Sequence, residues 1–280
     1  IHDAKQESID TILEMAEHKK GGKCKALIVS GCLAHRYHDE IEKEIPEVDA
    51  LLGTASYDKI AEVVLSVLEG KGYSCIDDAD RLVMTKDERI ITTGGYYEYL
   101  KIAEGCDNHC TYCIIPKVRG NYRSYPMEYL VKQAEQLAEK GVKELILVAQ
   151  ETTVYGVDIY GKKMLAELVK KLAAIKDIAW IRILYCYPEE IDDALIEVIK
   201  NEPKVCHYLD MPIQHASDSI LKKMGRRTTK QELKDVINKL RENIPDIALR
   251  TTLITGFPGE TQKDHEEMLD FVDEMEFDRL

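Results

Sequence analysis

One cysteine-rich loop stands out in the chain: Glu104-Gly105-Cys106-Asp107-Asn108-His109-Cys110-Thr111-Tyr112-Cys113. It follows an apolar segment near 97–103 whose composition predicts a strand. Three thiols within eight residues can converge on a common centre, and soft thiolates select zinc, copper(I) or iron–sulfur clusters. Three protein ligands leave one coordination position open, which is typical of a catalytic rather than a structural centre. The loop therefore predicts a metal centre at Cys106, Cys110 and Cys113.

The sequence lacks the second cysteine pair that a structural zinc site usually has, and this bears on which metal the loop binds. A structural zinc site usually has four closed ligands from two CxxC-like pairs, and no second pair occurs in this sequence. His109 is a poor fourth ligand because its neighbour Cys110 already points inward. An iron–sulfur cluster is therefore favoured, while zinc and unliganded thiols stay open as alternatives. With zinc, the chain would be a non-catalytic interaction module.

Apolar strands and amphipathic helices alternate after the loop. Strands are predicted near 97–103, 143–149, 179–184, 205–210 and 247–253. Each is followed by helical periodicity, near 126–140, 162–175, 189–200, 217–242 and 261–275. This alternation predicts an α/β fold in which a parallel sheet curves into a partial (β/α) barrel. Residues 277–280 are typical of the approach to a sixth strand, so we expect a barrel truncated before its last strand.

The residues before the barrel predict a smaller α/β domain. Its expected elements are a helix ending at Gly21, a strand at 26–29, a helix to about Glu44 and a helix at 57–68. Cys32 lies just past the end of the strand. Residues 70–95 are charged and irregular, so we place the domain boundary there. The predicted domains are 1–95, which begins as if cut from a longer chain, and 96–280.

The composition excludes several classes of protein. The 280 residues are 45% hydrophobic and 32% charged, which allows a large core and excludes disordered and collagen-like chains. No apolar run approaches the roughly 20 residues that span a bilayer, and the N-terminus has no signal region, so we expect a cytoplasmic protein without a membrane partner. The net charge of −13 disfavours nucleic acid and favours a basic protein partner. Eight cysteines in a chain of this length do not predict a disulfide framework.

Unusual polar residues occur where the predicted strands end, and ligands of parallel barrels bind at these ends. The residues are Glu104, Gln150, Glu151, Tyr185, Tyr187, Gln214, His215, Thr255 and Gly256. Each has a structural alternative: tyrosines pack as rings, glutamines satisfy strand-end backbone, histidine fills a core hydrogen bond and glycine makes a turn. Ring packing is the favoured prediction for Tyr185 and Tyr187, whereas Glu151 and His215 are expected to face a substrate.

A dense basic run follows the fourth strand and contains Lys222, Lys223, Arg226, Arg227 and Lys230. Cations at a helix C-terminus complement its dipole, and this is the favoured interpretation. The alternative is a docking patch for a partner.

The cysteine loop resembles the cluster motif of radical S-adenosylmethionine (SAM) enzymes. The resemblance implies that Cys106, Cys110 and Cys113 bind a [4Fe-4S] cluster whose fourth iron is chelated by SAM. It also implies reductive cleavage of SAM to a 5′-deoxyadenosyl radical, which needs an electron donor as a partner. Tyr112 matches the position whose backbone meets the adenine of SAM. Further cofactor contacts are expected from Gln150, Gln214, Thr255 and Gly256.

Other segments resemble the methylthiotransferase branch of these enzymes. They are residues 112–120 with Arg123-Ser124, residues 212–218 and residues 256–261. Within the branch, residues 147–156, Gln214-His215 and Arg250-Thr251-Thr252 are similar to the enzymes that modify a ribosomal protein. This implies addition of a methylthio group to the β-carbon of an aspartate in small-subunit ribosomal protein S-twelve, with one SAM for the methyl group and another for the radical. Relatives that modify a tRNA adenosine are the alternative.

The methylthiotransferase resemblance also implies a second [4Fe-4S] cluster in the N-terminal domain, which carries or supplies the sulfur. Gly31-Cys32-Leu33 matches one of its three cysteine positions, and the other two would lie before Ile1. The remaining cysteines are expected to be ordinary small apolar residues, namely Cys24, Cys75, Cys186 and Cys206. The resemblance also implies a carboxyl-terminal domain of the TRAM kind, which would lie after Leu280.

Overall fold

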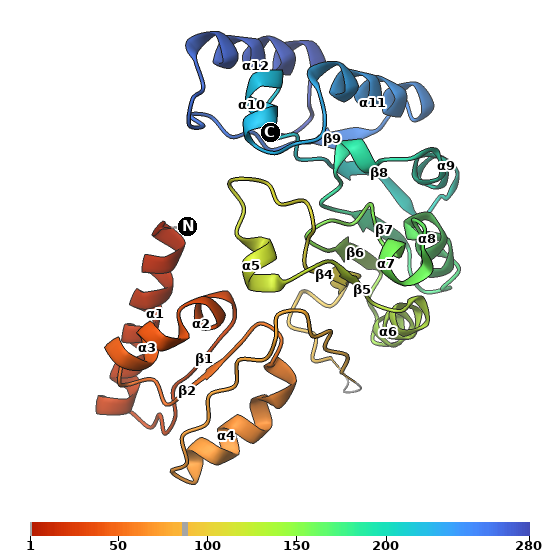
Figure 1. Ribbon diagram of the computed structural model, residues 1–280. Helices are drawn as coiled ribbons and strands as arrows, with labels where there is room; N and C mark the ends of the chain where they lie inside the picture. Colours follow the sequence, from red (N-terminus) through yellow and green to blue (C-terminus); the bar gives the residue numbers. More distant parts are fainter. Residues whose placement is uncertain (1, 86–88) are drawn as a thin grey trace. The chain divides into compact units, whose positions relative to one another are not determined.

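The computed structural model describes residues 2–85 and 89–280. Over these ranges the chain forms two units (Figure 1). The N-terminal unit comprises residues 2–85 and Ile114–Asn121, and the barrel unit comprises Arg89–Cys113 and Tyr122–Leu280. Ile1 of the predicted first helix and residues 86–88 of the predicted irregular stretch lie outside the described residues. None of the helices in the described ranges combines the length and the apolar character that crossing a lipid bilayer requires.

The N-terminal unit is built on a two-stranded parallel sheet. Strand β1 (Ile28–Ser30) pairs with β2 (Ala50–Leu52), so that Val29 lies opposite Leu51. Leu51 is fully buried and packs with Ile12 and Ile41 from two flanking helices. The helices of this unit are α1 (His2–Gly21), α2 (Cys32–Arg36), α3 (His38–Glu44), α4 (Ile60–Leu68) and α5 (Ile115–Arg119), with a 3-10 turn at Tyr57–Lys59.

The barrel unit contains a five-stranded parallel sheet whose strands follow one another in chain order. They are β3 (Tyr97–Lys101), β6 (Glu144–Val148), β7 (Trp180–Ile183), β8 (Val205–Asp210) and β9 (Ala248–Arg250). A short antiparallel pair, β4 (Ala103–Glu104) and β5 (Arg123–Ser124), follows the first strand. The sheet confirms the predicted parallel α/β architecture. Its five strands end at one edge, which we call the mouth.

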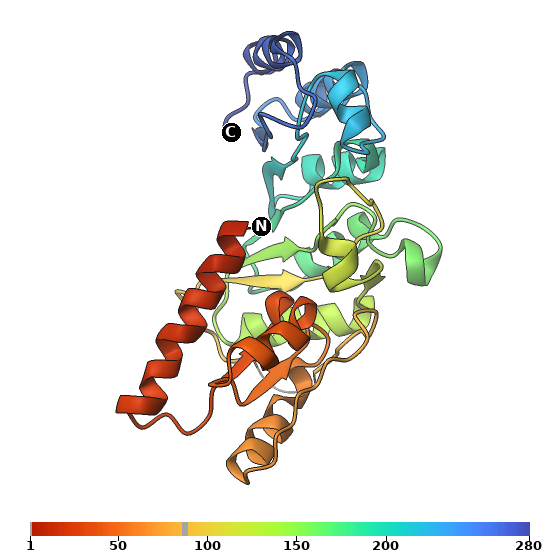
Figure 2. The ribbon, with the colours of Figure 1, turned by 60° about the vertical axis from the view of Figure 1, so that its left-hand side comes forward.

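Helices cover one face of this sheet (Figure 1 and Figure 2). Those in contact with its strands are α6 (Met127–Glu139), α8 (Leu165–Ala173) and α9 (Asp193–Asn201). The unit also contains α7 (Val157–Tyr160), α10 (Asp218–Lys223), α11 (Lys230–Asn243) and α12 (Gln262–Met275), with a 3-10 turn at Pro188–Glu190. Helix α6 buries Leu130, Ala134 and Leu137, which share one side at spacings of four and three. Leu145 of β6 is fully buried as well. Burial of each such leucine contributes about 2 kcal/mol before conformational entropy is counted.

The structure corrects the single helix predicted over 217–242. The segment forms two helices, because Gly225 adopts a left-handed φ of 74° just after α10. Helix α11 then begins at its own capping box, in which Thr229 and Glu232 bond each other's backbone N–H groups. The Thr-Thr-Lys-Gln-Glu sequence signals this start, but the apolar periodicity on both sides of it conceals the break.

Smaller differences follow from the shortness of the elements. The predicted helix that ends near Glu44 is interrupted at Tyr37, and the strand predicted at 97–103 is divided at Ile102. The sequence analysis missed β2, α5, β5 and α7, which have two to five residues each. Elements this short contain less than two periods of any hydrophobic pattern, so periodicity cannot detect them. Arg279, in the expected approach to a sixth strand, makes a parallel bridge with Arg250 of β9.

Candidate active site

The cysteine loop (Glu104–Cys113) is held by the end of helix α10. The backbone N–H of Thr111 donates to the Met224 carbonyl at 3.0 Å, and the Thr111 hydroxyl donates to the Lys223 carbonyl at 2.9 Å. Carbonyls in the last turn of a helix have no partner within the helix, so they are available for such bonds. The left-handed turn at Gly225 ends the helix, so that the carbonyls of Lys223 and Met224 can accept the hydrogen bonds of Thr111.

The three loop cysteines are free thiols in different surroundings. Cys106 and Cys110 are 7% and 5% exposed, whereas Cys113 is exposed. Burial raises the pKa of the Cys106 thiol. The Sγ atom of Cys110 lies 3.2 Å from the hydroxyl of Tyr187. Across residues 2–85 and 89–280, no three His, Cys, Asp or Glu side chains are gathered closely enough to hold a metal ion.

The donor set nevertheless fits an iron–sulfur cluster. Three thiols in one loop are the soft ligands that such a cluster takes, and none of them is in a disulfide. The loop has no helix or strand between Gly105 and Ile114. Bringing Cys113 to the other two thiols therefore breaks no helix or sheet hydrogen bonds.

A pocket of about 250 Å³ lies beside Cys106. Its lining consists of Cys106, Asp107, Asn108, Tyr122, Glu151, Val154, Val157, Asp158 and Arg227. Glu151 is 1% exposed, and its Oε1 accepts hydrogen bonds from the backbone N–H and the hydroxyl of Thr153. Its Oε2 is buried without a hydrogen-bond partner, and burial raises the pKa of this carboxyl to about 7. A buried acceptor left open in a pocket wall is characteristic of a ligand-binding group.

Gln150 connects two strand ends at the mouth. Its Nε2 donates to Glu104 Oε1 at 3.3 Å, and Glu104 Oε2 pairs with Lys101 Nζ at 2.5 Å. The Oε1 atom of Gln150 is buried and accepts no hydrogen bond from the described residues. Gln150 therefore retains a free acceptor beside the cysteine loop.

Backbone strain is concentrated around the mouth. Tyr185 after β7 and Gln214 after β8 have φ values of 60° and 72°, and His109 in the cysteine loop has 49°. Such conformations cost about 1–3 kcal/mol in a residue other than glycine. The backbone of Gln214 bonds to Thr252 and Ile254 of the next strand segment, which fixes it. Tyr185 is 47% exposed, so about half of its surface is covered by neighbouring residues.

His215 is fully buried beneath the loop that follows β9. Its Nδ1 accepts from the Ser217 N–H at 3.0 Å, so Nε2 carries the proton and lies 3.6 Å from Glu260 Oε1. Burial opposes ionisation of Glu260, but the Phe257 amide, His215 and His265 outweigh it and hold the Glu260 pKa below its ordinary value. His215 thus anchors a loop in this structure.

The segment around Gly256 meets the end of the cysteine loop. The rings of Tyr112 and Phe257 contact edge to face, with centroids 6.5 Å apart. Burial raises the pKa of Tyr112. Thr255 and Gly256 are exposed, and Gly256 has a φ of 71° that a turn glycine adopts readily.

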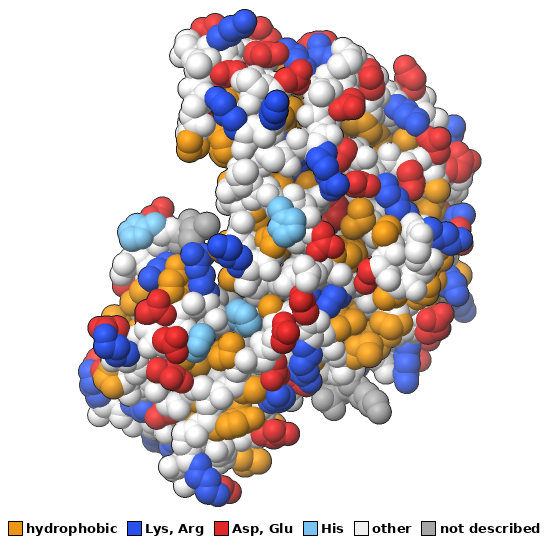
Figure 3. All heavy atoms as spheres, in the orientation of Figure 1, with side chains coloured by type: hydrophobic (Ala, Val, Ile, Leu, Met, Phe, Trp, Pro, Cys, Tyr) orange, Lys and Arg blue, Asp and Glu red, His pale blue; other side chains and the backbone are white. Residues whose placement is uncertain are grey.

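The basic run divides into separate side chains with different partners. Arg226 is buried, Arg227 donates to Asn108 in the cysteine loop at 2.7 Å, and Lys223 donates to the Gly259 carbonyl. Lys222 and Lys223 lie in the last turn of α10, which agrees with the favoured interpretation for these two. Figure 3 shows acidic and basic side chains interspersed on the visible face of the molecule.

Cys32 begins α2, just after strand β1, as the sequence predicts. It is half-buried and lines a pocket of about 230 Å³ inside the N-terminal unit. The other lining residues are Ala4, Lys5, Ser8, Leu33, Arg36, Tyr37, Ile114, Ile115 and Val118. None of them is a cysteine, so Cys32 meets no second thiol in this lining.

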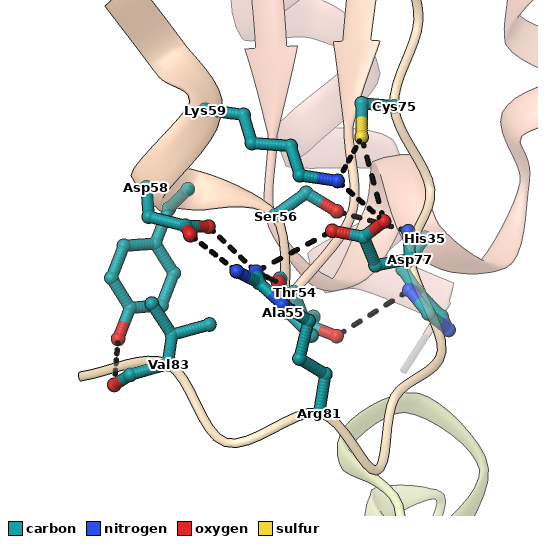
Figure 4. Close-up of polar contacts among 11 residues, drawn as sticks. His35, Thr54, Ala55, Ser56, Asp58, Lys59, Cys75, Asp77, Arg81 and Val83 are labelled. Atoms are coloured by element: carbon teal, nitrogen blue, oxygen red, sulfur yellow. Dashed lines mark hydrogen bonds and ion pairs between the residues drawn. The ribbon is translucent and has the colours of Figure 1, made fainter.

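Cys75 is buried and packs with Ala50, Leu52 and Val63, as expected of a small apolar residue, but its sulfur also has polar neighbours. Its backbone pairs with β2, and its Sγ lies 3.5 Å from Lys59 Nζ and 3.7 Å from Asp77 Oδ1 (Figure 4). Arg81 completes this network by donating to the Ala55 carbonyl and to Asp58. Cys186, by contrast, is fully buried, and burial raises the pKa of its thiol.

Sequence analysis did not identify Tyr122, Asp158 or Arg226 as site residues. Tyr122 and Asp158 line the pocket beside Cys106, but they come from the segment before β5 and from α7, which are short elements. Their proximity depends on Ser124, whose N–H donates to Asp158. Arg226 was hidden inside a run of charges.

Family comparisons cover most of the chain. The family model described as the Radical SAM superfamily matches residues 100–272. The family model described as Uncharacterized protein family UPF0004 matches residues 1–53. The two family models thus match separate parts of the sequence, with residues 54–99 between them.

Curated relatives are similar over the whole chain. The "Ribosomal protein uS12 methylthiotransferase RimO" of Lachnoclostridium phytofermentans is 68% identical over all 280 residues. The protein of the same name from Clostridioides difficile is 53% identical. The chain spans 64% and 63% of the lengths of these two relatives.

Solved structures share the fold. The radical SAM methyltransferase TsrM from Kitasatospora setae, with cobalamin and a [4Fe-4S] cluster bound, has a TM-score of 0.70 at 13% identity over 94% of this chain and 57% of its own. The cobalamin-dependent enzyme OxsB, with cobalamin and SAM bound, has a TM-score of 0.62 at 15% identity over 94% and 41%. At these identities the likeness concerns the fold alone.

Proposed function

This chain belongs to the radical SAM superfamily, and on that premise we propose that it acts in a methylthiotransferase that adds a methylthio group to the β-carbon of an aspartate in ribosomal protein uS12. The relatives named for this activity support the substrate. The net charge of −13 also suits a basic ribosomal partner in the cytoplasm. An electron donor is the other partner that the reaction needs.

The cysteine loop is the observation that carries this proposal. It presents three free thiols at the mouth of a parallel sheet, where ligands of this architecture bind. Cys106, Cys110 and Cys113 would hold a [4Fe-4S] cluster, with SAM bound at its open position. When bound, the two supply the electron and the radical that removes a hydrogen atom from an unactivated carbon.

The chain's own residues bind and orient around that centre. Gln150 and Glu151 have open acceptor oxygens for a ligand's N–H groups, and Glu151 keeps its proton up to a pH of about 7. Tyr112, Gln214, Thr255 and Gly256 would contact SAM from the other loops of the mouth. The buried positions of Cys106 and Cys110 exclude water from the reacting atoms.

The N-terminal part has a different role in this proposal. We assign residues 1–95 to a domain that carries the sulfur to be inserted and residues 96–280 to the radical chemistry. Cys32 would be one ligand of a second [4Fe-4S] cluster in this domain.

Gene deletion followed by mass spectrometry tests the proposal. We expect uS12 from cells without the full-length gene to lack the methylthio group, and the wild-type gene to restore it. A Cys110→Ser gene should not restore it, because the cluster loses a ligand. A Cys186→Ser gene should restore it, since this thiol lies outside the cysteine loop.

The same cells decide the alternative substrate. Nucleosides from their tRNA are analysed alongside uS12. Unchanged uS12 with a loss of methylthio groups confined to tRNA would replace the ribosomal protein by tRNA as the substrate. A Cys110→Ser gene that restores the uS12 modification would remove the radical SAM mechanism itself.

A further inference from the structure

Arg226 is a buried cation whose hydrogen-bonding capacity is largely unused. Its side chain is fully buried, and Nη2 alone has partners, Glu189 Oε2 at 3.1 Å and the Pro212 carbonyl at 3.5 Å. Nε and Nη1 are buried and have no acceptor in the described parts of the chain. A guanidinium carries five N–H donors, and a buried donor without an acceptor is costly. Two of the three guanidinium nitrogens therefore lack an acceptor among the described residues.

The surroundings of Arg226 indicate where that acceptor belongs. The guanidinium lies over the ring of Tyr187, 4.0 Å from its centroid. The hydroxyl of the same tyrosine lies 3.2 Å from Cys110 Sγ. Arg226 and the Cys110 thiol thus both contact the side chain of Tyr187.

We propose that Arg226 is the charged partner of the iron–sulfur cluster and that its free N–H groups hydrogen-bond the cluster's sulfur atoms or thiolate ligands. This inference rests on the proposed function, which supplies the cluster. The residues that Arg226 contacts support it, since one negative carboxylate at Glu189 satisfies only one of the three guanidinium nitrogens.

The expected consequence is a shift in the reduction potential. Reduction adds a negative charge to the cluster, and a fixed positive charge with N–H donors in a buried site favours the more negative state. Arg226 therefore raises the potential, which makes the cluster easier to reduce. Tyr187 transmits part of this effect through its hydroxyl at Cys110.

Arg182 provides a matched control within the same unit. It also pairs with a carboxylate, Glu144 at 2.7 Å, and it also lies over a tyrosine ring, that of Tyr208 at 5.1 Å. Within the described parts of the chain, Tyr208 makes no hydrogen bond to Cys106, Cys110 or Cys113. Arg182 lies in β7, before the mouth. Arg182 therefore matches Arg226 in charge, in its contact with a tyrosine ring and in its pairing with a carboxylate. It differs in that its tyrosine makes no hydrogen bond to Cys110.

The test is a redox titration of the full-length protein after anaerobic cluster reconstitution, followed by electron paramagnetic resonance. A Cys32→Ala background leaves only the cluster of the cysteine loop to observe. Wild type, Arg226→Met, Arg226→Lys and Arg182→Met are compared without SAM. We expect a lower potential for Arg226→Met, a smaller decrease for Arg226→Lys, and the wild-type value for Arg182→Met. Iron content and circular dichroism establish that each variant is loaded and folded.

Several outcomes would overturn the inference. Equal potentials in wild type and the loaded Arg226 variants would do so, as would an equal decrease in Arg182→Met. Weaker SAM binding with an unchanged potential would assign Arg226 to the cosubstrate instead. If Arg226→Met does not fold, the reduction potential of Arg226→Lys tests the inference instead, and a value equal to that of wild type would contradict it. A wild-type protein that takes up no iron would contradict the proposed function, which separates that failure from a failure of the Arg226 inference.

Discussion

The polar network of the N-terminal unit and the mouth of the barrel unit differ in how completely their polar groups are paired. In the network, the ammonium group of Lys59 donates to the Asp77 carboxylate at 2.8 Å, and the backbone N–H of Asp77 donates to the Ser56 hydroxyl at 2.9 Å (Figure 4). The guanidinium of Arg81 pairs with Asp58. In the described ranges, the buried side-chain atoms that lack partners all lie in the barrel unit. They include Gln150 Oε1, Glu151 Oε2, and Nε and Nη1 of Arg226.

Backbone strain shows the same contrast. The non-glycine residues with a left-handed φ in the described ranges all belong to the barrel unit, and Tyr185, Gln214 and His109 lie at the mouth or in the cysteine loop. Strained backbone and unpaired buried polar atoms both lower the stability of the fold. Regions that combine the two are typical of functional sites. The polar network, by contrast, serves the stability of its own unit.

The largest expected effect comes from relieving the buried charge of Glu151. Its pKa of about 7 lies above the ordinary 4.5, so the folded protein binds the extra proton, and stability falls as the pH rises from about 4.5 to 7. Glu151→Gln keeps the acceptor for Thr153 and removes the charge. We expect it to be more stable than wild type by up to about 3 kcal/mol at pH 8 and equal at pH 4.5.

Urea unfolding of the cluster-free protein at the two pH values measures this difference. Glu260→Gln is the control of opposite sign, because the pKa of Glu260 is lowered and its charge stabilises the fold. If the gain in the free energy of unfolding from Glu151→Gln were the same at both pH values, ionisation of Glu151 would not be what destabilises the wild-type protein.

The second effect is a loss of stability confined to the N-terminal unit. Arg81→Ala removes bonds to the Ala55 carbonyl and to Asp58, and because the side chain is 37% exposed we expect about 1 kcal/mol. Hydrogen exchange of β1 and β2 would accelerate, while that of β6 and β7 would not. Lys71→Ala, which removes an exposed pair with Glu69, should leave exchange unchanged. Acceleration in both units would contradict the assignment of the network to one of them.

The smallest effect concerns backbone strain. Gln214→Gly relieves a φ of 72°, and after the entropy cost of glycine we expect about 0.5–1 kcal/mol of added stability. Glu276→Gly relieves a φ of 42° at the end of α12, away from the mouth, and should stabilise to a similar extent. Only Gln214→Gly should also weaken SAM binding, measured by calorimetry. Equal SAM affinity in both variants would show that the left-handed conformation of Gln214 does not contribute to SAM binding.

The sequence predicted the repetitive parts of the fold better than the contacts of the site. Strands β6, β7 and β8 lie within two residues of their predicted ranges, because buried parallel strands are continuous apolar runs. Helices α10 and α11 were merged, since a glycine and a capping threonine between two apolar patterns were given too little weight. The cysteine loop and the strand-end residues could be named because their chemistry is unusual for those positions.

The remaining features depend on contacts between distant residues. Arg226 looks like any cation of a basic run until the fold places it over Tyr187, and Cys75 looks apolar until Lys59 approaches its sulfur. The left-handed conformation of Tyr185 has no sequence signal, since tyrosine does not favour it. Such features arise from tertiary packing, which local patterns do not encode.

The clamp between Thr111 and the end of α10 also constrains the order of assembly. Its two bonds join residues 112 and 113 positions apart, from Thr111 to Lys223 and Met224. A contact of such long range closes late, because the intervening chain must first lose most of its freedom. During synthesis the cysteines therefore leave the ribosome well before their anchor does, and the two bonds that hold the loop can form only after α10 has been made.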